Sequence, residues 1–249
     1  MACRLPGGIG SPSELWDFLM RKGCAQGPIP AQRFNKDGFY HQDGGGSTRP
    51  GLMNVGGGYF LDEDVRSFDN AFFGIHNLEA ASMDPQQRKL LEIVFECLEH
   101  AGISMEQVSG TATGVFVGNF TLDYQAMKNR DVDAINRFTL TGGGSTILAN
   151  RISHVFNLKG PSAVAALLDG DCDAAVVAAA NLFLSPEQYL GIAKAGVLSP
   201  TSTCHTFDIA ADGYGRGEAI NALYIKRLSS ALRDGDKIWA VIRSTAVNA

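Results

Sequence analysis

The sequence predicts an α/β layered fold, because short apolar runs typical of buried strands alternate with segments of helical periodicity. One continuous apolar run occupies residues 114–118 between two glycines, and a second occupies residues 174–180. Between them, residues 145–156 have helical spacing and follow three consecutive glycines. This order indicates helices packed on a sheet, and we expect the run at 114–118 to be buried on both faces.

Two helices are predicted before the first strand-like run. The first begins after Ser11, which suits an N-cap, with Pro12 at the first helical position. The second begins at residues 84–85 and ends before Gly102, because glycine favours helix C-termini. Its apolar residues recur at three- and four-residue spacing: Leu90, Leu91, Val94, Leu98 and Ala101. The glycine-rich residues 44–58 predict a long surface excursion between the two helices.

Two further strands are predicted in the C-terminal part of the chain. Residues 219–225 and 238–247 are each predominantly apolar and of strand length. They continue the alternation of helices and strands, which supports the α/β prediction.

Composition excludes several classes of protein. With 249 residues, 45% of them hydrophobic, the chain can bury a large core. Its net charge of −5 and the absence of a Lys/Arg-rich run argue against nucleic acid or an anionic membrane as partner. The longest apolar stretch, residues 174–184, is shorter than the ~20 residues of a membrane-spanning helix, and no signal peptide is recognisable. We therefore expect a cytoplasmic location.

The cysteines predict free thiols and no metal site. Their number is odd and they form no Cys-x-x-Cys pair, which suits a reducing compartment. The nearest groups of ligands, Cys97 with His100 and Cys204 with His205, offer two donors each, whereas zinc takes three or four. The five cysteines are Cys3, Cys24, Cys97, Cys172 and Cys204.

Ordered motifs along the chain carry a family resemblance. They are Met-Asp-Pro-Gln-Gln-Arg at 83–88, Leu-Ala-Asn-Arg-Ile-Ser at 148–153, Gly-Pro-Ser at 160–162, Thr-Phe-Asp at 206–208 and Asp-Gly-Tyr-Gly-Arg-Gly-Glu at 212–218. With these motifs the chain resembles the ketosynthase (β-ketoacyl synthase) domain of polyketide synthases. Segments 49–51, 57–61 and 68–75 most resemble the fungal, iterative, reducing subgroup. We therefore interpret residues 1–249 as one partial ketosynthase-like domain.

The resemblance implies a thiolase-like fold and acyltransferase chemistry. Such domains consist of two pseudo-symmetric α/β halves and use one Cys and two His. The Cys lies in a D-T-A-C-S-S-S elbow at a helix start and accepts an acyl chain as a thioester from a phosphopantetheine carrier protein. The two His, in H-G-T-G-T and G-H motifs, assist decarboxylation of the malonyl extender before condensation. No other cofactor is implied.

None of these three catalytic residues is present in the sequence. Residues 160–162 continue directly into residues 163–173, where the family has a strand, the elbow and half a helix, a loss of roughly 15–20 residues. By the same resemblance, Met1 falls just after the first core strand, which is central in its sheet, and Ala249 precedes the His-bearing half. We therefore expect mainly the N-terminal half of the fold. The family homodimer should be weakened, because its core includes the strand beside the elbow.

One family-motif loop is retained. By resemblance, it lies beside the active site, with Phe207 near the acyl pocket and its charged residues holding the loop through paired hydrogen bonds. The residues assigned to this loop are Thr206, Phe207, Asp208, Asp212, Arg216 and Glu218.

Cys204 and His205 are the candidates for a substitute nucleophile and base. Adjacent side chains of an extended segment point to opposite faces, which argues against a hydrogen-bonded dyad. The alternative is a loop cysteine matching the family's C-K-T-F-D segment, with His205 replacing a basic residue. Cys172 is a weaker candidate, because the flanking Asp171 and Asp173 disfavour its thiolate.

Three functions are compatible with the sequence. The first is a truncated ketosynthase-like protein of a polyketide pathway that cannot perform the standard decarboxylative condensation alone and is auxiliary to a full-length polyketide synthase or its acyl carrier protein. The second is a trans-acting acyltransferase, cyclase or chain-release enzyme with a rebuilt site. The third is a non-functional gene remnant. Whether the chain is an enzyme therefore stays open at the level of sequence.

Overall fold

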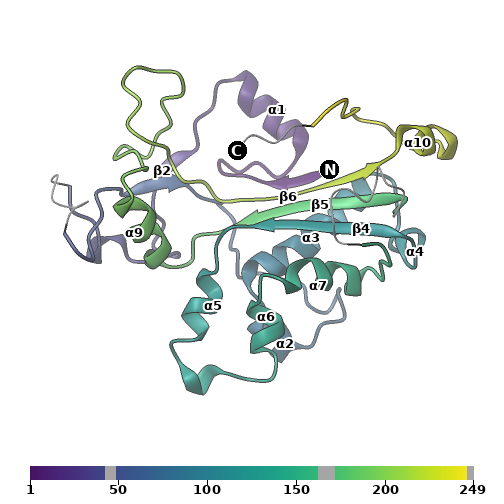
Figure 1. Cartoon of the computed structure of the whole chain (residues 1–249), viewed down its shortest axis with the longest axis horizontal. Helices are drawn as coiled ribbons and strands as arrows, with labels where there is room; N and C mark the ends of the chain where they lie inside the picture. The colour runs from purple at the N-terminus through teal and green to yellow at the C-terminus, as the bar shows by residue number, and fades with distance from the viewer. Residues whose placement is uncertain (43–48, 162–171, 246–249) are drawn as a thin grey trace.

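The computed structural model describes residues 1–42, 49–161 and 172–245, which form a mixed α/β arrangement (Figure 1). A sheet with strand order β1-β6-β5-β4 is covered on one face by helices α3 and α7. The strands are β1 (Ala2–Arg4), β2 (Gln26–Pro28), β3 (Gly57–Tyr59), β4 (Thr113–Asn119), β5 (Ala174–Asn181) and β6 (Ala219–Lys226). The α-helices are α1 (Pro12–Met20), α2 (Asn77–Ser82), α3 (Pro85–His100), α4 (Met105–Val108), α5 (Asp123–Lys128), α6 (Thr139–Gly143), α7 (Ile147–Val155), α9 (Pro186–Lys194) and α10 (Leu228–Asp234), with short 3₁₀ helices η1 (Lys36–Gly38) and η2 (Val132–Ala134).

The main sheet is mixed. Strands β4 and β5 are parallel, whereas β6 is antiparallel to both β5 and β1. Val115 of β4 pairs with Val176 of β5, and Ala178 of β5 pairs with Ala222 of β6. These four side chains are buried. Strands β5 and β6 therefore form the centre of the sheet.

Helix α3 is the main helix of the core. Asp84 caps its N-terminus by accepting a hydrogen bond from the backbone N–H of Gln86 at 2.8 Å, and Pro85 follows at the first helical position. Gly102, just beyond the helix, has a φ of +76°, a left-handed conformation that glycine adopts readily. The predicted helix is confirmed. Its apolar face is fully buried in the main core through Leu90, Leu91, Ile93 and Val94.

A second apolar cluster lies beside the separate β2–β3 hairpin. Its rings include Phe183 and Tyr189, which pack edge to face with centroids 5.6 Å apart. Tyr189 belongs to α9, and its hydroxyl donates a hydrogen bond to the Gly57 carbonyl of the hairpin. This cluster joins the hairpin, the β5–α9 turn and α9 into one packed unit.

Most of the predicted elements are confirmed. Helix α1 begins after the Ser11 cap, strands β4, β5 and β6 cover three of the predicted apolar runs, and α7 lies in the predicted helix between β4 and β5. The expected burial of residues 114–118 holds only for the first half, because Gly114 and Val115 are buried whereas Gly118 is exposed. Among the described residues, no strand pairs with the outer edge of β4 beyond Val115.

Two expectations are wrong. Residues 238–245 form no strand, and residues 246–247 lie outside the described ranges. No described strand lies in register with this segment, and Trp239 instead stacks on His100 with ring centroids 4.5 Å apart. Secondly, the first core strand is neither absent nor central: β1 pairs with residues 220–222 of β6 at one end of the strand order. Arg4 holds it there through a 2.9 Å hydrogen bond to Glu96 of α3.

Candidate functional site

The motif residues separate into an exposed loop and a buried pair. Thr206, Phe207, Asp208 and Asp212 are exposed, whereas Arg216 and Glu218 are almost completely buried. The Phe207 side chain is fully solvent-exposed, and its φ of +64° places it at a tight turn. Asp208 stabilises that turn by accepting a hydrogen bond from the Ala210 N–H at 2.9 Å.

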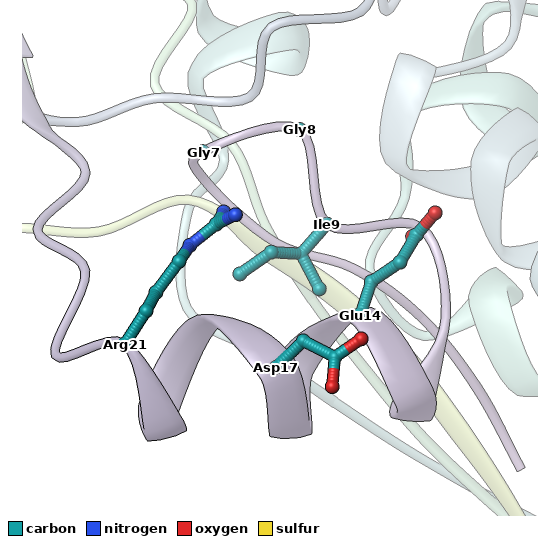
Figure 2. Close-up of a pocket in the computed structure, with 6 residues that line it drawn as sticks. All are labelled: Gly7, Gly8, Ile9, Glu14, Asp17 and Arg21. Atoms are coloured by element: carbon teal, nitrogen blue, oxygen red, sulfur yellow. The ribbon is translucent and has the colours of Figure 1, made fainter.

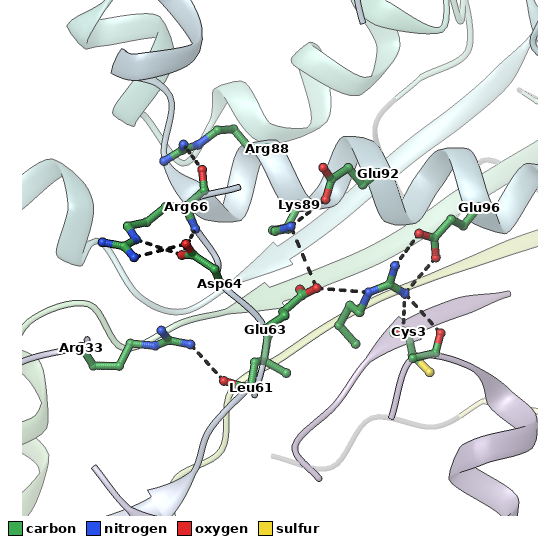
Figure 3. Close-up of polar contacts among 12 residues, drawn as sticks. Cys3, Arg33, Leu61, Glu63, Asp64, Arg66, Arg88, Lys89, Glu92 and Glu96 are labelled. Atoms are coloured by element: carbon green, nitrogen blue, oxygen red, sulfur yellow. Dashed lines mark hydrogen bonds and ion pairs between the residues drawn. The ribbon is translucent and has the colours of Figure 1, made fainter. Parts of the chain in front are cut away.

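Glu218 connects three segments that are distant in sequence. Its carboxylate accepts two hydrogen bonds from the Arg33 guanidinium, both at 2.8 Å. It also accepts the backbone N–H groups of Leu61 at 2.9 Å and Phe183 at 3.0 Å. Arg33 in turn donates to the Leu61 carbonyl at 3.4 Å (Figure 3). The motif loop therefore leads into a rigid, charged anchor at the start of β6.

Arg216 lies against two aromatic rings. Its guanidinium carbon is 4.0 Å from the ring centroid of Phe183 and 5.0 Å from that of Tyr189. Within the described part of the chain, neither terminal nitrogen has a hydrogen-bond acceptor. Burial lowers the pKa of this guanidinium, although the nearby Tyr189, Tyr214 and Asp123 favour its charged form.

Two buried carboxyl groups lie just beyond the carboxyl ends of β4 and β5. Asp123, at the start of α5, accepts the N–H groups of Leu184 at 2.9 Å and Ser185 at 3.1 Å, and burial raises its pKa. Burial also raises the pKa of Asp84 to about 6. The sequence analysis did not single out either residue as part of a site; the motif at 83–88 was the signal that pointed to Asp84.

The weak candidates Cys204 and His205 do not form a dyad. Cys204 is exposed, and its Sγ accepts a hydrogen bond from the Gly215 N–H at 3.3 Å. Among the described residues, no hydrogen bond joins the Cys204 and His205 side chains. The His205 carbonyl accepts the Asp208 N–H as part of the loop turn. Cys172 is buried.

A surface hollow beside α1 is separate from the motif loop (Figure 2). Glu14 lies on its rim and accepts the Gly10 N–H at 2.7 Å, which contributes most to lowering the pKa of this exposed carboxyl. The lining residues are Gly7, Gly8, Ile9, Glu14, Asp17 and Arg21. None of them is a nucleophilic thiol or an imidazole, so we assign no acyl-transfer role to this hollow.

The flanks of the Ser162–Ala163 join are anchored on opposite edges of β4, although the join itself lies outside the described residues. On the outer edge, Gly160 N–H donates to the Thr113 carbonyl and the Pro161 carbonyl accepts the Val115 N–H, both at 3.2 Å. On the edge shared with β5, the Asp173 N–H donates to the Ala112 carbonyl at 3.2 Å.

In the described ranges, no group of three or more His, Cys, Asp or Glu side chains could hold a metal ion, and no helix is long and apolar enough to cross a membrane. The chain matches the family model for the β-ketoacyl synthase N-terminal domain in two segments, residues 1–166 and 162–231. The two matches meet at the Ser162–Ala163 join.

Fungal highly reducing polyketide synthases are similar to the whole chain. The chain is 59% identical to fogA of Aspergillus ruber and 60% identical to virA of Hypocrea virens. Both alignments cover 100% of the chain and are 265 residues long for a chain of 249, which leaves 16 positions without a counterpart. The chain spans only 11% of the length of these two relatives.

Solved ketosynthases have the same fold. The oxazolomycin ketosynthase domain OzmH KS7 of Streptomyces albus superposes with a TM-score of 0.88 at 34% identity, over 99% of this chain and 45% of that one. The ketosynthase from module 6 of the bacillaene synthase of Bacillus subtilis gives a TM-score of 0.82 at 32% identity, over 95% of this chain and 41% of that one. The fold is the thiolase-like fold of ketosynthases, and the chain belongs to the β-ketoacyl synthase family, whose N-terminal domain it matches.

Proposed function

We propose that this chain is a ketosynthase-like protein of a polyketide pathway that does not catalyse decarboxylative condensation by itself. It acts in the cytoplasm as an auxiliary to a full-length polyketide synthase or its acyl carrier protein. The observation that carries this proposal is the sequence between Gly160 and Asp173, which contains no D-T-A-C-S-S-S elbow. A condensing ketosynthase needs that thiolate to hold the growing acyl chain.

The anchored flanks support the proposal. Pro161 runs beside the start of β4 in the direction of that strand, and Asp173 leads into β5, which is parallel to β4. A connection between parallel strands needs a dozen or more residues. Only 11 residues, 162–172, separate the two anchors in the sequence, which is fewer than such a connection needs.

The alignments with the fungal relatives support the number of residues that the family resemblance predicts to be missing. The 16 unmatched positions fall within the roughly 15–20 residues expected for the strand, the elbow and half a helix. The two segments of the family-model match overlap at residues 162–166, which supports a discontinuity near the join. Since this strand belongs to the dimer core of the resembled family, the proposal includes a weakened homodimer.

Intact mass spectrometry tests the proposal. The purified chain is incubated with acyl-loaded and malonyl-loaded carrier protein, beside a full-length highly reducing polyketide synthase as positive control. We expect the mass of the chain to stay unchanged and no condensed product to form. An acylated chain or a condensed product would overturn the proposal, and circular dichroism of the same sample shows that the chain is folded.

One observation favours a second function, that of a trans-acting acyltransferase, cyclase or chain-release enzyme. The Cys204 thiol is exposed, and its Sγ accepts a hydrogen bond from the Gly215 backbone N–H at 3.3 Å. Pathway product is measured in strains carrying Cys204→Ser or His205→Ala, beside deletion of the gene. Loss of product in the deletion but not in the two variants would remove this assignment and favour the auxiliary role.

The remnant hypothesis has its own test. Transcript sequencing across the codons for Ser162 and Ala163 shows whether the join exists in the messenger RNA. An in-frame D-T-A-C-S-S-S segment in the transcript would remove the premise of the auxiliary role and indicate an ordinary condensing domain.

A further inference from the structure

Two of the five cysteines are exposed, and both border the same hairpin. Cys24 and Cys204 are exposed, whereas Cys3, Cys97 and Cys172 are buried. Cys24 precedes β2 by two residues, and Cys204 precedes the motif loop by two residues. Exposed thiols are the ones that react with small electrophiles and oxidants.

Tyr59 connects the two segments that carry these thiols. It pairs with Gln26 of β2 on one side, and its backbone N–H donates to the Arg216 carbonyl at 2.8 Å on the other. Its ring packs on Gly215, where a Cβ would approach Tyr59 Cε2 to 2.7 Å. The N–H of the same glycine donates to the Cys204 Sγ at 3.3 Å.

A second contact brings the loop of Cys204 to the strand that follows Cys24. The Gln26 side-chain amide donates to the Thr201 carbonyl at 3.4 Å. Burial raises the pKa of the Tyr59 hydroxyl; the Cys24 and Cys204 thiols raise it further, whereas the Cys204 backbone lowers it. The segments that carry the two exposed thiols therefore lie side by side next to Tyr59, although they are far apart in sequence.

We propose that Cys24 and Cys204 form a redox-active thiol pair that closes into a disulfide by exchange with a low-molecular-weight disulfide. The Cys204 sulfur accepts a hydrogen bond from the Gly215 N–H, and the Cys204 side chain is exposed. The loop of Cys204 contacts the β2–β3 hairpin through Gln26 and Tyr59. The proposed disulfide requires a movement of this loop that brings the Cys204 sulfur to bonding distance of the Cys24 sulfur. The closed pair fixes the motif loop against β2.

The exchange balances without any further reagent. One thiolate attacks the low-molecular-weight disulfide, forms a mixed disulfide on the protein and releases one reduced thiol. The other cysteine then attacks the protein sulfur of that mixed disulfide, forms the Cys24–Cys204 bond and releases the second reduced thiol. Both protein thiols are oxidised, the small disulfide is reduced to two thiols, and the two protons end on those leaving thiols.

Oxidised glutathione is the probe for the test. The reduced chain is incubated with it, the reaction is stopped by acid, and the intact mass is measured. We expect the mass to fall by two hydrogen atoms with no glutathione retained. Non-reducing tryptic digestion is expected to give a cross-linked pair of peptides, residues 23–33 and 195–216, which each contain one of the two cysteines.

Single substitutions distinguish a pair from two independent thiols. Cys24→Ser and Cys204→Ser are each expected to retain one glutathione, because the second cysteine that would release it is missing. Two glutathiones on the unaltered chain, a disulfide between two copies of the chain, or no reaction at all would each overturn the proposal. Far-ultraviolet circular dichroism of the serine variants, which alter exposed side chains only, checks that they are folded. The outcome is independent of the test for condensation.

Discussion

Glu218→Gln is the substitution that tests the structural role of the motif segment most directly. The carboxylate of Glu218 is completely buried and accepts two N–H groups from Arg33 and two from the backbone of Leu61 and Phe183. Glutamine preserves the shape but leaves the guanidinium of Arg33, 3% exposed, without its counter-charge. Breaking a buried ion pair by changing one partner costs about 3–5 kcal/mol. We expect the free energy of unfolding to fall by that amount.

Urea denaturation followed by circular dichroism measures this loss. Asp208→Asn is the matched control, because it makes the same chemical change on an exposed residue of the same loop and should alter the free energy by less than about 0.5 kcal/mol. A loss below about 1 kcal/mol for Glu218→Gln would refute the argument. The double variant Arg33→Met/Glu218→Leu should recover part of the loss, because it leaves no unpaired charge.

Three further predictions concern the stability of variants in the core, at the buried Asp84 and at the flank of the join. Leu91→Ala removes a fully buried side chain of α3 and should lower the free energy of unfolding by about 2–5 kcal/mol in the same urea assay. The folded-state pKa of Asp84 is raised from 3.8 to about 6, so the folded chain binds this proton more tightly and loses stability as pH rises from about 4 to about 6. Asp84→Asn should flatten the dependence of Tm on pH in that window, as measured by calorimetry. Gly160→Ala places a Cβ 2.4 Å from the Thr113 carbonyl carbon and should lower Tm, whereas Gly118→Ala, whose Cβ meets nothing within 4 Å, should not.

Local patterns predicted the elements whose signals are themselves local. One short segment contains the Asp84 cap, the apolar periodicity of α3 and Gly102, so the helix and both of its ends could be predicted from adjacent residues. The apolar run at 238–247 shows the limit of this reasoning. A strand needs a partner, and among the described residues none lies beside 238–245.

Contacts between segments that are distant in the chain could not be predicted from the sequence. Glu218 was assigned to a loop-holding role by resemblance, but its partner Arg33, 185 positions away, has no motif that identifies it. Cys204 and His205 are weak candidates from the sequence, where their adjacency argues against a hydrogen-bonded dyad. In the fold, the neighbours of Cys204 are Gly215, Tyr59 and the segment of Cys24. Residues with reactive or charged side chains could be identified from the sequence, whereas the residues that contact them could be identified only from the structure.

The flanks of the join lie beside β4, at one end of the strand order, whereas the buried centre of the sheet is formed by β5 and β6. Within the described residues, β5 pairs with β4 and β6, and α3 packs against β5 and β6. Among the residues that the structure describes, the outer edge of β4 is paired only near Thr113 and Val115. A loss at that edge therefore exposes the backbone of residues 116–119 but leaves the buried centre and the Glu218 anchor in place. Edge strands contribute less buried surface than central ones, so the described core keeps its buried centre at β5 and β6 although no described strand pairs with the outer edge of β4 beyond Val115.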